Sequence, residues 1–402
     1  MTAERESLPG ELSGRARQLL LELCALSSPS GDADGVGAMA ARLHTELGRR
    51  GLACEIERLR GSDGELHPVL LARGPGGADR HLLLVGHMDT VLPAIPPRLN
   101  GDRLEATGAL DMKGGLAMLL GALDLMAARG DRVPDGLVLV AVPDEEASGL
   151  ISEQVVRRWS EGARAVLVLE PGEARGDRET LVAGRRGLTE WQLQVVGRAS
   201  HSGLAYWAGR SALAAAADWC LRAQRMSVPG PGRTVNVGRL VAGTADFVDR
   251  LGESHELLGS SGQRNVIADR AVADGELRYL SSAEGIAAMG ELADLARRVA
   301  AEHEVEATLT TGATVPPVDP HGPGEALVRR AVELAAARGF RLEVETDRGG
   351  VSFPNYLADP AGVAVVDGLG PVGNGMHTRD EWLDLRSLDR RIVLLADLLA
   401  TL

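Results

Sequence analysis

The sequence predicts an α/β protein in which a domain with a mixed, largely parallel sheet is interrupted by a smaller α+β domain. Continuous apolar runs at residues 81–85 and 136–142, separated by a helical pattern, are typical of strands buried on both faces. From Gly187 onward the strands instead alternate polar and apolar residues, as in TEWQLQVV at 189–196, which indicates one buried face. A continuous apolar run returns at 362–367. The chain is therefore expected to leave the first domain, build a second and return.

The elements of the first domain follow from the spacing of apolar residues. Apolar positions at every third or fourth residue predict helices, and continuous apolar runs predict strands. We expect helices over 13–26, 35–50 and 112–129, and strands over 54–59, 81–85, 136–142 and 163–169. After the insert, the same criteria predict a helix over 326–337, a strand over 362–367 and a closing helix over 388–402.

The inserted domain is predicted to have the element order β-α-β-β-α-β, which is typical of a ferredoxin-like α+β domain. Its strands are expected over 189–196, 235–241, 271–280 and 305–311, and its helices over 211–225 and 283–301. We place this domain at residues 187–311, so that residues 1–186 and 312–402 together form the first domain.

Composition excludes several classes of function. The chain has 402 residues, more than the ~100–200 of one typical domain, and a formal net charge of -13, which argues against nucleic acid or an anionic membrane as partner. No apolar run approaches the ~20 residues of a membrane span, and the polar first residues lack the apolar core of a secretory signal. Cys24, Cys54 and Cys220 form no CxxC pair and are typical of reduced thiols. We therefore expect a cytoplasmic protein.

Histidines and acidic residues follow the predicted buried strands. In open α/β sheets, ligands bind outside the carboxyl ends of the strands, so side chains at these ends are expected to converge. The residues concerned are His87 and Asp89 after the first such strand, Asp144, Glu145 and Glu146 after the second, and Glu170 after the third. Three adjacent acids repel one another unless cations neutralise them, although an exposed acidic turn is an alternative.

Two further candidates lie outside these strand ends. Asp111 precedes a predicted helix, where it is either a metal ligand or an N-cap, and His377 lies in a glycine-flanked loop, where a structural role is the alternative. Gly114 and Gly115 weaken the first turn of that helix by ~1 kcal/mol each, a cost that is easier to understand where the backbone passes close to something.

Taken together, the candidates comprise two histidines, an aspartate able to bridge and several glutamates, with no thiolate. Such mixed nitrogen and oxygen ligands suit zinc, cobalt or manganese in a catalytic site better than structural zinc. One carboxylate more than the metals require would remain to act on water, which is the arrangement of a two-metal hydrolase.

Six segments resemble the signature blocks of the M20 metallopeptidases, the group of carboxypeptidase G2, acetylornithine deacetylase and succinyl-diaminopimelate desuccinylase. They occur in the family's order across residues 80–385: LLLVGHMDTV, GALDMKGG, PDEEASG, VLEPGE, GRASHSG and GNGMHTRDEW. The resemblance implies a zinc-hydrolase domain interrupted by a lid domain that also forms a homodimer, in agreement with the predicted insert.

The resemblance also implies a role for each matched residue. Glu145 would be the general base that takes a proton from water, and Asp89 would orient a metal-binding histidine. Two Zn²⁺ ions per subunit are implied, with Co²⁺ or Mn²⁺ as substitutes. Their ligands would be His87 and Glu170 at one ion, Glu146 and His377 at the other, and Asp111 as the bridge.

Three residues of the insert match further family positions. His201, in the segment SHSG, resembles the lid histidine that stabilises the oxyanion in a partner subunit's active site, although a capping or surface histidine is the alternative. Asn265 and Arg278 resemble residues that contact the carboxylate end of the substrate, and an exposed strand cation is an equal alternative for Arg278.

The sequence also departs from the family pattern. The stretch 310–314 lacks an arginine that often contacts the substrate, and the segment GGVSF at 349–353 has an aromatic residue where the family has an acid. Residues 244–264, which include His255, form an apparent insertion that either extends the lid or is a loop decoration. A substitute for the missing arginine could come from another loop, namely from Arg178, Arg185 or Arg186.

These residues predict a metal-dependent hydrolase that cleaves the amide bond of a small N-acyl amino acid or dipeptide with a free carboxylate, as a glutamate carboxypeptidase does. Glu170, rather than aspartate, resembles the carboxypeptidase and deacylase members. The second hypothesis is a biosynthetic deacylase of the acetylornithine or succinyl-diaminopimelate type, or a pathway-specific deprotecting amidohydrolase. The third is a catalytically silent metal-binding dimerisation module, for which loss of a ligand or of the base would be expected.

Overall fold

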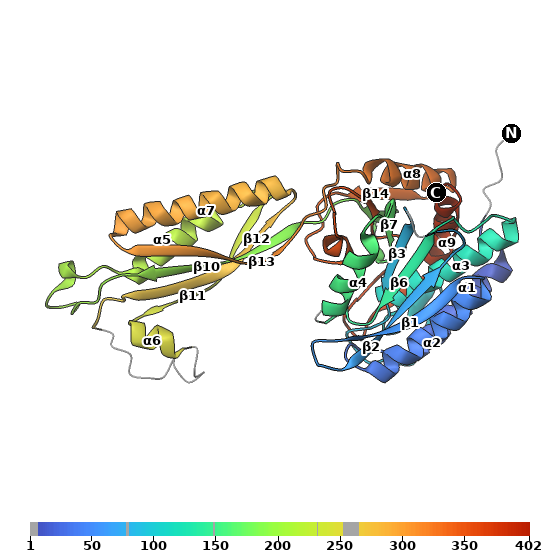
Figure 1. Cartoon of the computed structure of the whole chain (residues 1–402), viewed down its shortest axis with the longest axis horizontal. Helices are drawn as coiled ribbons and strands as arrows, with labels where there is room; N and C mark the ends of the chain where they lie inside the picture. Colours follow the sequence, from blue (N-terminus) through green and yellow to red (C-terminus); the bar gives the residue numbers. More distant parts are fainter. Residues whose placement is uncertain (1–6, 78–79, 148, 231, 252–264) are drawn as a thin grey trace. The chain divides into compact units, whose positions relative to one another are not determined.

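The computed structural model describes residues 7–77, 80–147, 149–230, 232–251 and 265–402. It consists of two compact units, each with its own hydrophobic core (Figure 1). The first unit runs to Arg185 and resumes over Val318–Arg348 and Ser352–Leu402, and the second contains Arg186–Pro317 and Gly349–Val351. The chain thus returns to the first unit at residue 318 rather than at 312, because the last strand of the second unit continues to Val315.

The larger unit contains a six-stranded mixed sheet. Its strand order is β1 (Ala53–Arg60), β2 (Leu66–Arg73), β6 (Leu137–Val142), β3 (Leu82–His87), β7 (Ala165–Val168) and β15 (Ala364–Val366). The β6–β3, β3–β7 and β7–β15 pairs are parallel, and β1 and β2 add antiparallel strands at one side. Every residue of β3 and β6 is buried, as their continuous apolar sequences predict. The predicted α/β fold class is confirmed.

Six α-helices in the described residues belong to this unit. They are α1 (Gly10–Ala25), α2 (Ala33–Arg49), α3 (Gly114–Arg129), α4 (Leu150–Ser160), α8 (Glu325–Ala337) and α9 (Leu385–Leu399). Helix α2 begins where the Asp32 carboxylate accepts the N–H of Gly35 at 2.9 Å, and it packs on β1 and β2, whereas α4 packs on β3 and β6. Helix α3 is apolar almost all round because it lies between α1 and α9 and against the sheets.

A second, seven-stranded sheet completes this unit, and the sequence patterns did not predict it. Its order is β14 (Arg341–Glu345), β9 (Arg178–Val182), β8 (Pro171–Arg175), β16 (Gly370–Asn374), β17 (Trp382–Asp384), β5 (Arg103–Glu105) and β4 (Arg98–Asn100). Each strand has only three to five residues, too few to show a period. The pairing of β8 with β16 brings the segment after β7 beside the segment after β15.

The second unit is a four-stranded antiparallel sheet with the order β11-β12-β10-β13. Along the chain its elements are β10 (Gly187–Val196), α5 (Ala212–Gln224), β11 (Thr234–Gly243), α6 (Ala245–Arg250), β12 (Arg270–Tyr279), α7 (Ser282–His303) and β13 (Glu306–Val315). Helices α5 and α7 lie on one face (Figure 1), where Trp191 and Trp219 pack edge to face at 5.0 Å. Apart from the short α6, this is the predicted ferredoxin-like order.

Of the apparent insertion at 244–264, the structure describes α6, whereas residues 252–264, including His255, lie outside the described residues.

Among the helices in the described part of the chain, none combines the length and the apolarity that a bilayer crossing requires.

Candidate metal centre

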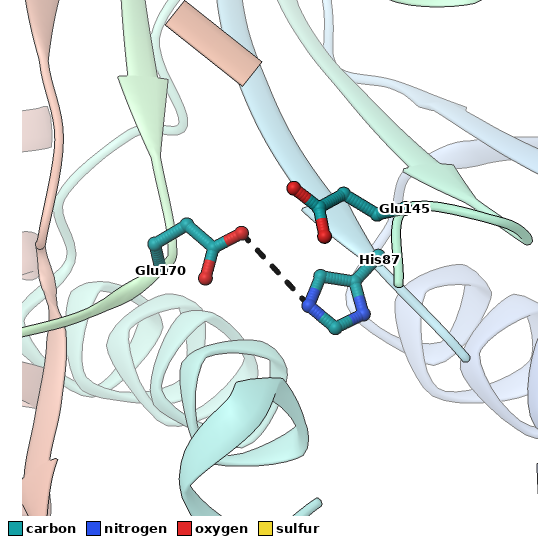
Figure 2. Close-up of side chains that lie close together, drawn as sticks. All are labelled: His87, Glu145 and Glu170. Carbon is teal, nitrogen blue, oxygen red and sulfur yellow. Dashed lines mark ion pairs between the residues drawn. The ribbon is translucent and has the colours of Figure 1, made fainter. Parts of the chain in front are cut away.

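Four of the predicted site residues lie at one edge of the six-stranded sheet. His87 is the last residue of β3, Glu170 follows β7, and Glu145 and Glu146 follow β6. Because β3 is parallel to both β6 and β7, the three strands end at the same edge. Figure 2 shows the side chains of His87, Glu145 and Glu170 pointing toward one another, and their ligand atoms lie within 4.8 Å of one another.

Asp111 joins this cluster from the turn before α3, and its two carboxylate oxygens face different histidines. Oδ1 lies 3.1 Å from Nε2 of His87, and Oδ2 lies 3.3 Å from Nε2 of His377. Nε2 of His377 also lies 3.0 Å from Oε2 of Glu146, and Nε2 of His87 lies 3.8 Å from Oε1 of Glu170. Two ligands at ~2.1 Å from a tetrahedral zinc ion are about 3.4 Å apart, so these separations fit metal ions between the donors.

The cluster contains more negative charge than a buried position tolerates. Burial and the neighbouring charge of Asp111 raise the pKa of Glu146 to about 8, and the same two causes raise the pKa of Glu170 well above its ordinary value. The hydrogen bond with Asp111 raises the pKa of His377 to about 9. Burial also raises the pKa of Glu145. A bound cation would supply the missing positive charge.

Asp89 holds two parts of the cluster together. Nδ1 of His87 lies 2.9 Å from the main-chain oxygen of Asp89 and 3.4 Å from its Oδ1. The same carboxylate accepts the main-chain N–H groups of Glu145 and Glu146 at 3.2 and 3.1 Å, and the hydroxyl of Ser30 at 2.7 Å. Asp89 therefore contacts the histidine that it was expected to orient and also fixes the acidic loop after β6.

Asp144, the first of the three adjacent acids, has a structural role in α4. Its carboxylate accepts the main-chain N–H groups of Ile151 and Ser152, both at 2.9 Å, and the Ser152 hydroxyl at 2.7 Å. These bonds satisfy donors in the first turn of the helix. Only the two following glutamates of this trio are directed to the cluster in the described structure.

The two glycines at the start of α3 allow a close backbone approach, as expected from their cost to the helix. A Cβ on Gly115 would lie 2.1 Å from the main-chain oxygen of Leu169, the residue before Glu170. A Cβ on Gly114 would lie 2.4 Å from a methyl group of Leu383. The absence of side chains here lets the Asp111 segment and the Glu170 segment pack directly together.

We expect Gly115→Ala to lower the free energy of unfolding by about 1–3 kcal/mol, since the new methyl group overlaps a main-chain oxygen that cannot rotate away. At an unhindered helical site the same change stabilises by up to ~1 kcal/mol. Gly37→Ala in α2 is the matched control, because a Cβ there meets nothing within 4 Å. Urea denaturation measures both variants, and equal stability of the two would contradict the contact.

Lys113, two residues after Asp111, is the only lysine of the sequence. Its side chain is 1% exposed, and Nζ donates a hydrogen bond to the main-chain oxygen of Leu26 at 2.7 Å. Burial lowers the pKa of this amine. Lys113 therefore ties the end of α1 to the turn that carries Asp111.

The three predicted residues of the second unit lie within that unit, and the structure brings two of them together. His201 follows β10, is exposed, and lies with Nε2 3.4 Å from Nδ2 of Asn265. Its Nδ1 accepts the main-chain N–H groups of Gly203 and Leu204. Arg278 lies on β12, where it is paired with Glu276 at 2.8 Å, so it already has a counter-ion.

The three arginines considered as substitutes for the missing one are also engaged. Nε of Arg185 is buried and lies 2.6 Å from Asp367. The other two are held at the surface, Arg178 by Glu343 at 3.3 Å and Arg186 by the Thr234 hydroxyl at 3.3 Å.

The segment 349–353, which departs from the family pattern, lies partly against the cluster. The ring of Phe353 is buried with its centroid 6.1 Å from that of His87, and the Ser352 hydroxyl donates to Oε1 of Glu170 at 3.4 Å. The aromatic residue thus packs on a predicted metal-binding histidine.

Sequence reasoning missed three residues that hold the cluster in place: Ser30, Ser352 and Glu381. Each acts through a hydrogen bond to a residue far away in the chain, which spacing alone does not reveal. Glu381 lies four residues after His377 in the block GNGMHTRDEW, but this block contains two acids, Asp380 and Glu381, and only the structure shows which of them is buried.

Histidines and carboxylates gathered at the carboxyl edge of an α/β sheet form a donor set suited to metal-dependent hydrolysis. The model of peptidase family M20/M25/M40 matches residues 83–401, and the chain belongs to this family. The protein is therefore an enzyme of the metallopeptidase and amidohydrolase class.

Individual relatives agree with this assignment. The chain is 29% identical to carboxypeptidase G2 from Pseudomonas sp. (strain RS-16), over 95% of this chain and 88% of that protein. It is 26% identical to a succinyl-diaminopimelate desuccinylase from Rhizorhabdus wittichii, over 84% of this chain and 85% of that protein. The fold is similar to the crystal structure of aminopeptidase PepT from Bacillus cereus, with a TM-score of 0.76, 20% identity and coverage of 96% of this chain and 98% of the other.

Proposed function

We propose that the protein is a dinuclear metal-dependent hydrolase that cleaves the amide bond of a small N-acyl amino acid or dipeptide with a free carboxylate. The observation that carries the proposal is the position of Asp111, whose two oxygens face His87 and His377 separately. A carboxylate with one oxygen directed to each of two histidines is placed to bridge two metal ions.

The donor set supports zinc, with cobalt or manganese as substitutes, because it contains imidazole and carboxylate groups and no thiolate. The ligands would be His87 and Glu170 for one ion, Glu146 and His377 for the other, and Asp111 for both. When bound, the two ions would lower the pKa of a water molecule and polarise the substrate carbonyl.

The protein's own contribution to the reaction is the transfer of a proton. Glu145 lies beside His87 and Glu170, and the burial that raises its pKa brings its basicity closer to that of a group working near neutral pH. Glu145 would take a proton from the attacking water and deliver it to the leaving amine. Asp89 would keep both the His87 ring and the Glu145 main chain in position.

The second unit would supply the remaining contacts. We propose that it forms a homodimer in which His201 stabilises the oxyanion and Asn265 and Arg278 contact the carboxylate of the substrate. The hydrogen-bond distance between His201 and Asn265 supports a joint action of these two residues, whereas Arg278 would have to exchange Glu276 for the substrate.

The carboxypeptidase reading rests on carboxypeptidase G2, a relative over nearly the whole chain. A biosynthetic deacylase is the second candidate, since a desuccinylase is similar over almost the same length. A panel of N-acyl amino acids and dipeptides tests both: amine release would be measured with zinc- or cobalt-loaded protein and with EDTA-treated protein. Metal-dependent turnover supports the hydrolase, and the preferred leaving amino acid decides between the two candidates. No turnover across the panel by metal-loaded protein would contradict both.

The charge balance predicts that metal-free protein loses stability as the pH rises from about 5.5 to 8. The pKa of Glu146 is raised to about 8 in the folded state, so as the pH rises its carboxyl group ionises in the unfolded chain before it ionises in the folded protein. The free energy of unfolding therefore falls with rising pH over this range. His377, whose pKa in the folded state is about 9, also contributes less to the free energy of unfolding as the pH rises. Differential scanning fluorimetry of EDTA-treated protein at both pH values measures the effect.

Glu146→Gln removes the carboxylate and serves as the control for this pH dependence. The variant should show a smaller fall in melting temperature between the two pH values, and zinc should restore the wild-type protein at pH 8 by binding the folded state. An equal fall in wild type and variant would exclude Glu146 as a cause of the pH dependence.

A further inference from the structure

Glu381 is a buried carboxylate that touches none of the predicted ligand side chains in the described contacts. Glu381 lies between His377 and the start of β17 at Trp382, and it is 3% exposed. Oε2 accepts the main-chain N–H of Gly108 at 2.7 Å, and Oε1 accepts those of Leu110 and Asp111 at 2.8 and 3.0 Å. One carboxylate therefore accepts three main-chain N–H groups within the four residues that end at the bridging candidate, Asp111.

The segment Ala109–Lys113 forms a short helical turn that is irregular at Asp111 and Met112. Gly108 has φ +71°, Asp111 has the non-helical φ -116° and ψ 97°, and three N–H groups of this segment share the acceptor Glu381. Three N–H groups that converge on one point need an acceptor, since an unpaired buried N–H costs ~1–3 kcal/mol. Glu381 supplies it, and a carboxylate offers enough lone pairs for all three bonds.

The same residue closes the loop that carries His377. The main-chain oxygen of Glu381 accepts the N–H of Ala106 at 3.2 Å, and the next residue begins β17. His377 itself has φ +65°, an uncommon conformation for a residue other than glycine, and the Thr378 hydroxyl and main-chain N–H both bond to the Gly375 oxygen. The side chain of Glu381, four residues after His377, thus connects the end of the His377 loop to the Asp111 segment.

We propose that Glu381 is a positioning residue that holds the Asp111 and His377 segments at the separation that two metal ions require. This inference rests on the proposed function, because it assumes that the cluster binds metal. The geometry supports this role, because both oxygens of Glu381 are used to hold the main chain of the Asp111 segment.

Glu381→Gln is the direct test. The amide has one accepting oxygen, and its NH₂ group would face at least one of the three N–H donors, so the Asp111 segment must shift. We expect affinity for zinc, measured by competition with a chromophoric chelator, to fall about 10–100-fold, as is usual when a group that supports metal ligands is lost. The visible spectrum of Co²⁺-loaded protein should change as well, because it reports the geometry of the ligands.

Glu179→Gln is the matched control. Glu179 is also a buried glutamate of the first unit, and it pairs with Arg390 and Arg391 on α9 instead of the metal cluster. This control should lower the melting temperature while leaving zinc affinity and the cobalt spectrum unchanged, which separates positioning from general destabilisation. Glu381→Asp keeps the charge but has a shorter side chain, and its zinc affinity should lie between those of wild type and Glu381→Gln. If Glu381→Gln does not fold, Glu381→Asp replaces it in the test.

The outcomes distinguish this inference from the proposed function. Wild type that binds no metal would overturn both. Wild type that binds two metal ions, with zinc affinity within about twofold in the folded Glu381 variant, would overturn only the role of Glu381. A reduced zinc affinity in both the Glu381 and the Glu179 variants would also overturn it, since the effect would then be one of stability.

Discussion

Glu145→Gln is expected to lower kcat about 10²–10⁴-fold, the usual contribution of a general base. The change removes the proton-accepting charge but preserves the size and the position of the side chain. Since the main-chain N–H of residue 145 would still bond to Asp89, the acidic loop should keep its place. The measurement is single-substrate kinetics with the best substrate of the panel, on protein whose metal content has been determined.

The number of bound metal ions shows whether residue 145 is a general base or a metal ligand. We assign Glu145 as the base and Glu146 as a ligand because Oε2 of Glu146 lies 3.0 Å from His377, whereas Glu145 lies beside His87 and Glu170. Glu145→Gln should therefore retain two metal ions per subunit while losing turnover, and Glu146→Gln should lose one ion. Turnover of the Glu145 variant within about tenfold of wild type, or loss of an ion from it, would show that the assignment is wrong.

Asp111→Asn should weaken the binding of at least one metal ion by more than about 100-fold. An amide offers one oxygen acceptor and one NH₂ donor, so it cannot direct an oxygen to both histidines as the carboxylate does. Loss of one of two ions removes several kcal/mol of transition-state stabilisation, and kcat should fall by at least 10². Metal titration followed by calorimetry measures the two binding steps separately.

Asp397→Asn is the control for this substitution. Asp397 is a buried aspartate paired with Arg129 and Arg338, and Arg129 lies at the end of α3 remote from Asp111. A helix of that length spans about 24 Å, so the control lies far from the cluster. The control variant should lose stability and keep both ions. Two intact binding steps in Asp111→Asn would contradict a bridging role.

The sequence was sufficient to predict those features that follow from a local pattern of apolar residues or from the presence of histidines and acids. Buried parallel strands such as β3 and β6 have continuous apolar sequences, and the groups that follow them are histidines and acids, so both the fold class and the convergence of the cluster could be predicted. The predicted helices begin and end within a few residues of their expected positions for the same reason, whereas α4 and α6 were not predicted.

What could not be predicted depends on contacts between distant segments. The seven-stranded sheet is built of short strands whose pairing comes from the whole chain, and β13 extends to Val315 because it continues to pair with Leu188 of β10. Asp144 and Glu146 are neighbours with equal chemistry, yet one accepts N–H groups of α4 and the other faces His377. Residue type and spacing give no means of distinguishing such neighbours, since the direction of each side chain is set by the loop; only the resemblance to a family separated them.

The burial of Lys113 has a practical consequence for following the protein in solution. Reagents that acylate primary amines, and proteases that cut after lysine only, meet no accessible lysine side chain while the turn before α3 is intact. Because Lys113 lies two residues from Asp111, its modification reports the opening of the very segment that carries the bridging carboxylate. The mass of the peptide that contains Lys113 therefore follows local unfolding of this segment without a substitution in the protein.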